Sequence, residues 1–288
     1  MRLKRFFAAF AAAVMMLCSV STVSAESVLD KVTMRYYKVP AADASLSGKK
    51  LIGGRLFVFD DEGVPSPYTG KYKTNKGTRY FIDGSPWFGW MKISGAWYYF
   101  DPSNRGYMAV SKAKTALGTY SFSENGKWNG KYTVSAKVPS DFSLYVHNYG
   151  ENIDEIFDTA DNKLMLNYFT LDNEKSYTKR IAVSKADKQI LYDMFVSCNV
   201  YKIKTVLDGE VLSAANGSNE YYAPENIKSF CISVNANGKN YTVKGDNSMY
   251  TFYDDSKDVR SMAYYTAFIG KYIETMTAYK SIIKAYNE

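Results

Sequence analysis

The sequence contains very little histidine and cysteine, two residues on which many catalytic and metal-binding sites depend. Among its 288 residues there are one histidine and three cysteines. Zinc hydrolases use several histidine and acidic ligands, and structural zinc sites use paired cysteines such as Cys-x-x-Cys, which this chain lacks. The composition therefore excludes these metal-dependent classes, and we predict neither a metal site nor a cofactor.

The small number of thiols also restricts covalent chemistry. Cys18 lies near the N-terminus, so Cys198 and Cys231 are the thiols of the main part of the chain. In an oxidising compartment these two form one disulfide or stay free and buried, and the sequence leaves both outcomes open. Only His147 is available to activate either thiol as a nucleophile. Because Cys231 stands in an alternating apolar segment typical of a packed strand, we predict no catalytic residue.

Long apolar runs are scarce as well. One run, residues 6–17, is shorter than the roughly 20 residues that a membrane-spanning helix needs. Three basic residues precede it, and the small residues Val23, Ser24 and Ala25 follow it. This order is typical of a secretory signal peptide. We therefore expect residues 1–25 to be removed, which leaves a secreted chain without a membrane span.

Dense runs of basic residues are absent too, which argues against nucleic acid as a partner. The charge is nevertheless unevenly distributed. Residues 26–135 contain 16 Lys and Arg against 9 Asp and Glu, whereas residues 136–288 contain 17 against 20. The basic front half suits a polyanionic partner, although scattered solvated charges also explain an excess of this size.

What the sequence does contain is an aromatic repeat in its front half. Each of four segments has a glycine, an alternating aromatic strand, a polar turn and a closing glycine. The closing glycines are Gly63, Gly84, Gly106 and Gly126, which are 21, 22 and 20 residues apart. A period of about twenty residues fits one β-hairpin with its connection, and hairpins must stack to be stable. We predict a leader segment at 26–50 and a mostly β front module, a short solenoid of stacked hairpins, at 51–134.

One unit of the repeat carries a family resemblance. The segment GWMKISGAWYYFDPSNRGYMA, residues 89–109, resembles the cell-wall-binding repeat of choline-binding and glucan-binding proteins of Gram-positive bacteria. In choline-binding members, tryptophan, tyrosine and methionine side chains form a cage that holds a quaternary ammonium by cation–π attraction. Carried over by position, the resemblance implies a cage that comprises Trp90, Trp97, Tyr99, Met108 and, from the next hairpin, Tyr120. The same rings are equally suited to stacking on sugar rings or to packing as solenoid core.

The resemblance implies a secreted bacterial surface protein that is retained on the cell wall without a covalent anchor. Its partner would be cell-wall teichoic acid, a choline-bearing polymer or a glycan. No C-terminal sorting motif follows Tyr286, which agrees with non-covalent retention. We predict that the protein is not an enzyme. Two alternatives stay open: an enzyme that acts on wall or glycan and is targeted by the repeats, and a protein whose repeats are purely structural and whose back half is the binding part.

The pattern changes after a proline-containing linker at 135–141. Strand-like segments at 142–146, 163–169 and 177–183 are followed by a helical pattern at 184–198. Residues 142–288 are therefore expected to form a compact α+β domain with two helices.

Three local signals support this expectation. Ser184 and Asp187 form a capping box at the start of the first helix. Asn237 and Gly238 supply the turn of a β-hairpin. Residues 258–286 have the apolar period of one long amphipathic helix. No motif in the domain indicates its partner or its function.

Overall fold

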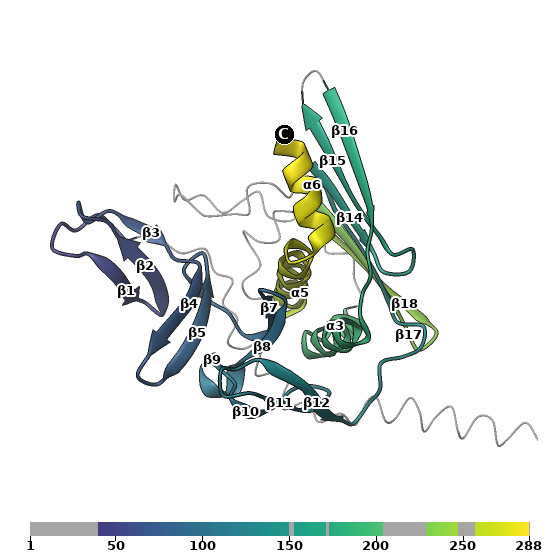
Figure 1. The fold of residues 1–288 in the computed structure, drawn as a ribbon, viewed down its shortest axis with the longest axis horizontal. Helices are drawn as coiled ribbons and strands as arrows, with labels where there is room; N and C mark the ends of the chain where they lie inside the picture. Colours follow the sequence, from purple (N-terminus) through teal and green to yellow (C-terminus); the bar gives the residue numbers. More distant parts are fainter. Residues whose placement is uncertain (1–39, 150–152, 171–172, 204–228, 247–256, 288) are drawn as a thin grey trace, which may run out of the picture.

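The structure, a computed structural model, describes residues 40–149, 153–170, 173–203, 229–246 and 257–287. The predicted signal peptide and the first part of the predicted leader lie outside the described residues. Small antiparallel sheets form the front half, and a six-stranded sheet with helices forms the back half (Figure 1). The expected fold class, a β-hairpin module followed by an α+β domain, is confirmed.

The front module consists of four three-stranded antiparallel units. The first contains β1 (Gly48–Ile52), β2 (Arg55–Phe59) and β3 (Pro65–Pro67); the second contains β4 (Gly70–Thr74), β5 (Gly77–Ile82) and β6 (Ser85–Pro86). The third contains β7 (Gly89–Ile93), β8 (Ala96–Asp101) and β9 (Tyr107–Met108); the fourth contains β10 (Ser111–Lys114), β11 (Gly118–Phe122) and β12 (Trp128–Val134). The glycine period of the sequence is thus a period of hairpins.

The strand register shows that the units are equivalent position by position. Each unit pairs its opening residue with a buried phenylalanine: Gly48 with Phe59, Gly70 with Phe81, Gly89 with Phe100, and Ser111 with Phe122. The four closing glycines all have φ between 73° and 77°, the left-handed region that favours glycine. The repeat therefore conserves one turn and one core position from unit to unit.

One antiparallel sheet of six strands, in the order β16-β15-β14-β13-β17-β18, forms the basis of the back half. Its strands are β13 (Ser143–Tyr149), β14 (Ile153–Asp158), β15 (Lys163–Thr170), β16 (Asn173–Arg180), β17 (Ser229–Ala236) and β18 (Lys239–Asp246). Asn237 and Gly238 have φ of 57° and 70° between β17 and β18, which confirms the predicted hairpin turn. The strand β14 has no counterpart among the expected strands.

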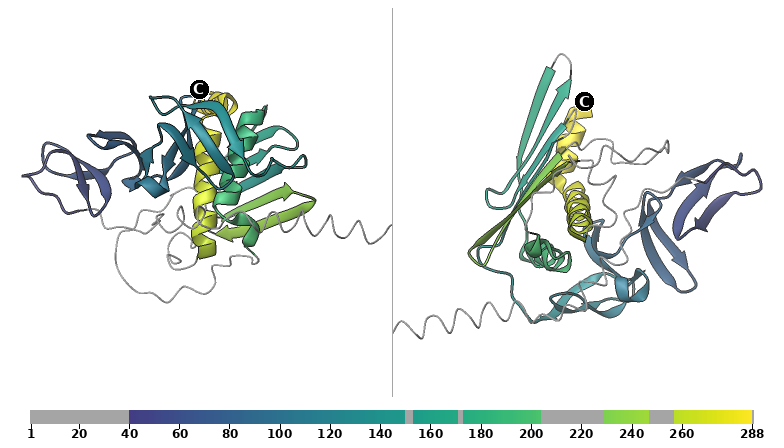
Figure 2. Two further views of the ribbon diagram at one scale, coloured as in Figure 1. Left: turned by 90° about the horizontal axis from the view of Figure 1, so that it is seen from below. Right: turned by 180° about the vertical axis from the view of Figure 1, so that it is seen from behind.

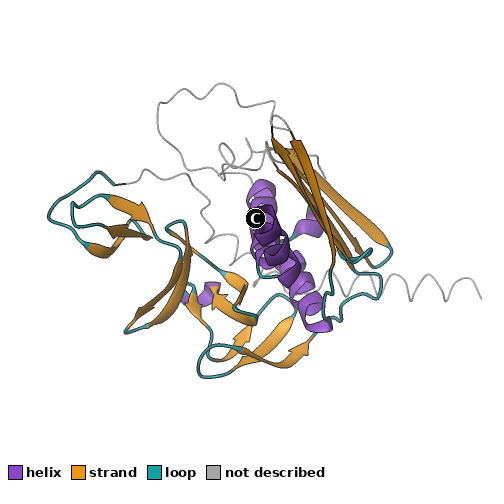
Figure 3. Ribbon diagram, turned by 45° about the horizontal axis from the view of Figure 1, so that its top comes forward, coloured by secondary structure: helices purple, strands orange, loops and turns teal. Residues whose placement is uncertain are grey.

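Helices cover one face of this sheet (Figures 1 and 3). The described α-helices are α3 (Lys185–Ser197), α5 (Lys257–Glu274) and α6 (Thr277–Asn287), and the short 3-10 helices are η1 (Pro102–Asn104) and η2 (Val200–Lys202). The hydroxyl of Ser184 accepts a 3.0 Å hydrogen bond from the backbone N–H of Asp187, so the predicted N-cap of α3 is confirmed. None of the helices in the described part of the chain is long and apolar enough to cross a membrane.

The segment expected to form one long helix is divided into α5 and α6. The Thr275 hydroxyl donates a 2.7 Å hydrogen bond to the Tyr272 carbonyl, and the Thr275 N–H bonds the same carbonyl at 3.1 Å. Such short-range bonds tighten the last turn of a helix and satisfy a carbonyl that a continuing helix would use. The apolar period runs on through α6, so the sequence pattern alone does not show the break.

Apolar side chains on alternate strand positions face the helices. They are buried and include Leu144, Val146, Phe157, Leu166 and Ile232. Their core continues without interruption into the third and fourth hairpin units. By contrast, the first and second units project away from the helices (Figure 2). The segment 135–141, expected to be a linker, joins two parts that share one core.

Candidate functional site

The predicted cage residues of the third unit do lie close together. The Trp90 ring is at the centre, with its centroid 6.4 Å from that of Trp97, 5.2 Å from that of Tyr99 and 4.9 Å from that of Tyr120. All four side chains are at most 5% exposed. Met108 is half-buried, and its side chain lies against the backbone of Gly126. The sequence therefore identified one cluster, but the cluster is interior.

Neighbouring segments cover these rings. Tyr272 of α5 stacks on Trp97 with ring centroids 5.6 Å apart and planes 14° apart, and Phe268 of the same helix lies 6.1 Å away. Trp128 of the fourth unit lies 5.9 Å from Trp90. Of the interpretations that the sequence left open, packing as core is the one that these contacts support.

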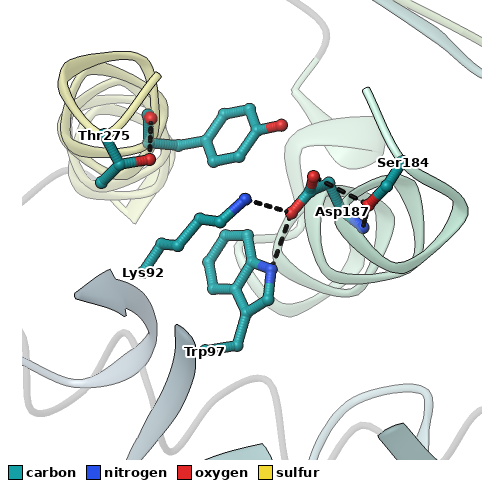
Figure 4. Close-up of polar contacts among 6 residues, drawn as sticks. Lys92, Trp97, Ser184, Asp187 and Thr275 are labelled. Atoms are coloured by element: carbon teal, nitrogen blue, oxygen red, sulfur yellow. Dashed lines mark hydrogen bonds and ion pairs between the residues drawn. The ribbon is translucent and has the colours of Figure 1, made fainter. Parts of the chain in front are cut away.

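A carboxylate on the α+β domain holds the third unit, and sequence reasoning assigned it only a capping role. Asp187 Oδ1 accepts hydrogen bonds from Lys92 Nζ at 2.7 Å and from Trp97 Nε1 at 2.8 Å (Figure 4). Its Oδ2 accepts a 2.8 Å bond from the Ser184 hydroxyl. Burial by itself raises the pKa of the Asp187 carboxyl, but these donors, Lys92 first, outweigh it and bring the pKa below its ordinary value. The carboxylate is therefore ionised and paired.

The same helix holds the fourth unit with polar side chains. Asp193 is fully buried, and its Oδ2 accepts a 2.6 Å hydrogen bond from the Thr115 hydroxyl, just after β10. Gln189 Nε2 donates a 2.8 Å bond to the Tyr120 hydroxyl. Burial raises the pKa of Asp193 to about 6, although hydrogen bonds, that from Thr115 first, oppose the rise. Helix α3 thus presents a row of polar contacts to two consecutive hairpin units.

Comparison with known proteins bears on the front module. No protein-family model and no curated protein matches the chain. Among solved structures, CbpJ from Streptococcus pneumoniae TIGR4 is 23% identical over 30% of this chain and 32% of that chain, with a TM-score of 0.23. The choline binding domain of Spr1274 in Streptococcus pneumoniae is 27% identical over 30% of this chain and 98% of that chain, with a TM-score of 0.23. CbpF in complex with ipratropium is 26% identical over 35% of this chain and 32% of that chain, with a TM-score of 0.24.

The front module resembles choline-binding repeats. The chain spans about a third of the CbpJ and CbpF chains and nearly the whole Spr1274 domain. The likeness covers about a third of this chain.

Within the front module, the residue at the position of Trp90 differs from unit to unit. Its register equivalents are all exposed lysines, namely Lys49, Lys71 and Lys112. The Lys49 ammonium lies 3.9 Å from the centroid of the Tyr68 ring, and the Lys71 ammonium lies 3.8 Å from that of Tyr98. Two aromatic rings of the module therefore already carry a cation from the chain itself.

Two of the three residues that could form a nucleophilic pair, His147 and Cys231, lie together on the sheet face opposite the helices. His147 on β13 pairs directly with Cys231 on β17, and the Tyr149 ring stacks on His147 at a centroid distance of 3.6 Å. Cys198, at the end of α3, is buried, and both thiols are free, so the disulfide left open by the sequence is not formed.

The surroundings of the two thiols disfavour their activation. Burial raises the pKa of the Cys198 thiol and also that of Cys231, which the nearby Lys244 only partly opposes. The thiolate is the reactive form, so a raised pKa disfavours nucleophilic attack. Among the residues that the structure describes, no three His, Cys, Asp or Glu side chains are grouped so as to hold a metal ion.

Proposed function

We propose that this is an exported bacterial surface protein that binds a cell-wall polymer non-covalently through its front module and presents a non-catalytic α+β domain. The observation that carries the proposal is the fourfold hairpin register, which repeats one glycine turn and one phenylalanine position. The solved structures that share the repeat include a choline binding domain. The candidate polymers are teichoic acid, a choline-bearing polymer and a glycan.

The four units have two roles: the third and fourth contact the α+β domain, and the first and second bind the polymer. The third and fourth units share one buried core with the α+β domain, so they fix its position relative to the module. The first and second units project outward (Figure 2), and β1 is exposed along its whole length. Lys50 and Lys73 are exposed on these outer units. Residues 48–86 contain 7 Lys and Arg against 4 Asp and Glu, so the two outer units together have the net positive charge that attracts a phosphate-bearing polymer.

Sedimentation of the mature chain, residues 26–288, with purified Gram-positive cell walls tests this function. We expect most of the protein to sediment at low salt and the bound fraction to fall as NaCl rises, because salt screens exposed charges. The double variant Lys50→Glu/Lys73→Glu should bind roughly tenfold more weakly, as expected when two cations near an anionic surface are reversed. The matched variant Lys175→Glu/Lys179→Glu, on exposed positions of β16, should bind like wild type. Wild-type protein that stays in solution at low salt would contradict the proposal.

A second candidate function assigns binding to the α+β domain and a purely structural role to the repeats. The stacking of Trp97 on Tyr272 favours it for the third unit. In that case the Lys50→Glu/Lys73→Glu variant would sediment with walls as well as wild type, so one assay separates the two functions.

A further inference from the structure

The Lys92 ammonium lies in a box made by three different segments of the chain. Its Nζ is 5.4 Å from the centroid of the Trp97 ring on β8 and 5.1 Å from that of Tyr272 on α5. The third wall is Asp187 of α3, whose Oδ1 accepts a 2.7 Å hydrogen bond from Nζ. The Lys92 side chain is 19% exposed and that of Asp187 is 10% exposed.

This combination of walls is the chemistry that binds an ammonium ligand. Aromatic faces attract a cation through their quadrupole, more strongly when water is excluded. A carboxylate that accepts a charge-assisted N–H hydrogen bond adds direction, which selects an ammonium that carries hydrogens. Here the cation and Trp97 come from the hairpin module, whereas Tyr272 and Asp187 come from the α+β domain.

We propose that this box is a binding site for primary ammonium whose ligand is the chain's own Lys92, and that its occupation locks the hairpin module onto the α+β domain. The unit that best matches the choline-binding repeat then takes no external quaternary ammonium. Its Trp97 ring binds an internal cation, the Lys92 ammonium, instead.

The first and second units contain a simpler arrangement, in which a lysine ammonium lies over one aromatic ring. Lys49 and Lys71 stand where the third unit has Trp90, and each ammonium lies within 4 Å of a ring centroid, that of Tyr68 or Tyr98. One lysine from each of the first, second and third units thus has its ammonium group near the centre of an aromatic ring.

Chemical rescue of a lysine variant tests the site in the full mature chain. Lys92→Ala removes the propylammonium portion of the side chain and leaves the box without its cation. We expect the melting temperature to fall by about 4–8 °C, because a partly buried ion pair loses one partner. Added n-propylammonium chloride should restore at least half of that loss relative to NaCl at the same ionic strength. Tetramethylammonium should not, since it has no N–H to donate to Asp187.

Lys114→Ala is the matched control. Lys114 occupies the register position of Lys92 in the fourth unit but faces Thr119 rather than a tryptophan, and it is exposed. Its variant should melt within about 1 °C of wild type and gain nothing from n-propylammonium. Equal responses of the two alanine variants to n-propylammonium would overturn the proposal.

A second set of variants keeps the test decisive where Lys92→Ala does not fold. Lys92→Met retains most of the apolar stem, and Asp187→Asn retains the shape of the acid. The melting-temperature losses of these two should be non-additive, with the double variant losing clearly less than their sum. Additive losses would show that Lys92 and Asp187 do not act as one site.

The consequence for choline rests on the proposed wall binding. If resident lysines occupy the aromatic sites, excess choline should leave the wall-bound fraction of wild-type protein unchanged. Elution by choline would overturn this part of the inference. Failure to bind walls at all would contradict the proposed function, while the rescue of Lys92→Ala would still decide the internal ammonium site.

Discussion

Trp97 donates a 2.8 Å hydrogen bond from its indole Nε1 to Asp187 Oδ1, across 90 positions of sequence. The contact joins the best-preserved hairpin unit to the first helix of the α+β domain. The flat face of the same indole stacks on Tyr272 of α5. Both the polar and the apolar parts of Trp97 are therefore used inside the molecule, at a position that the repeat family assigns to a ligand.

Replacing Trp97 with phenylalanine separates these two parts. Trp97→Phe keeps an aromatic ring but removes the N–H, so the buried Asp187 loses one donor. We expect the free energy of unfolding to fall by about 1–3 kcal/mol, measured by urea denaturation. Trp128→Phe is the control, because the Trp128 Nε1 bonds the Lys131 carbonyl at 3.2 Å in an exposed setting. A loss at Trp97 no larger than that at Trp128 would show that the Asp187 bond contributes little.

The shared core predicts that the two halves unfold together. All four tryptophans, Trp87, Trp90, Trp97 and Trp128, stand in the hairpin module, whereas the long helices belong to the back half. Tryptophan fluorescence and far-ultraviolet circular dichroism should therefore give coincident melting curves in the mature chain. The isolated fragment 26–135 should show red-shifted emission and a broad transition, because Trp97 loses its cover. Separate midpoints for the two probes in the mature chain would contradict a common core.

Local features of this fold were predictable from sequence because their causes are local. The closing glycines mark a left-handed turn wherever they occur, and the hydroxyl of Ser184 caps the helix that begins after it. The hairpin at Asn237 and Gly238 belongs to the same class. Each signal lies within a few residues of the structure that it specifies.

The features that sequence reasoning missed depend on distant partners. Asp187 has a sufficient local explanation as a capping residue, so nothing near it indicates that Lys92 and Trp97 also bind it. The strand β14 was missed because its sequence, IDEIFD, is rich in acids, which strands disfavour. One of those acids, Glu155, accepts a 2.9 Å hydrogen bond from Asn148 on the neighbouring strand. Assigning the aromatic cluster to core rather than to a cage likewise required the position of α5.

Asp193 predicts a pH dependence of stability with a definite sign. Burial raises its pKa to about 6 in the folded protein, above the ordinary value of 3.8 that an unfolded chain shows. The folded state therefore binds the extra proton, and stability from this group is full below pH 3.8 and falls as pH rises through 6. Asp193→Asn removes the dependence, so its stability relative to wild type should increase between pH 4 and pH 7 by on the order of 2 kcal/mol. Urea denaturation at several pH values measures this difference.

Asp187 should show a pH dependence of stability opposite in sign to that of Asp193. Its pKa is lowered in the folded state, chiefly because the hydrogen bonds from Lys92 and Ser184 outweigh burial. It contributes stability above its ordinary pKa and loses that contribution as pH falls. The destabilisation by Asp187→Asn should therefore be largest near neutral pH and fade below about pH 4. Parallel pH profiles for the two asparagine variants would contradict the two opposite environments.

The raised pKa values of the thiols predict that Cys231, the thiol beside His147, reacts slowly as a nucleophile. Reaction with a disulfide reagent at pH 7.5 requires thiolate, so Cys231 should react more slowly than a free thiol, and the buried Cys198 should react only on unfolding. His147→Ala should leave the rate at Cys231 within about twofold of wild type if the imidazole does not activate the thiol. The measurement is the absorbance of the thiolate that the reagent releases. The Cys198→Ala variant reports the rate at Cys231, and the Cys231→Ala variant reports the rate at Cys198. A fast Cys231 whose rate collapses in His147→Ala would instead identify an activated pair and support a wall-acting enzyme.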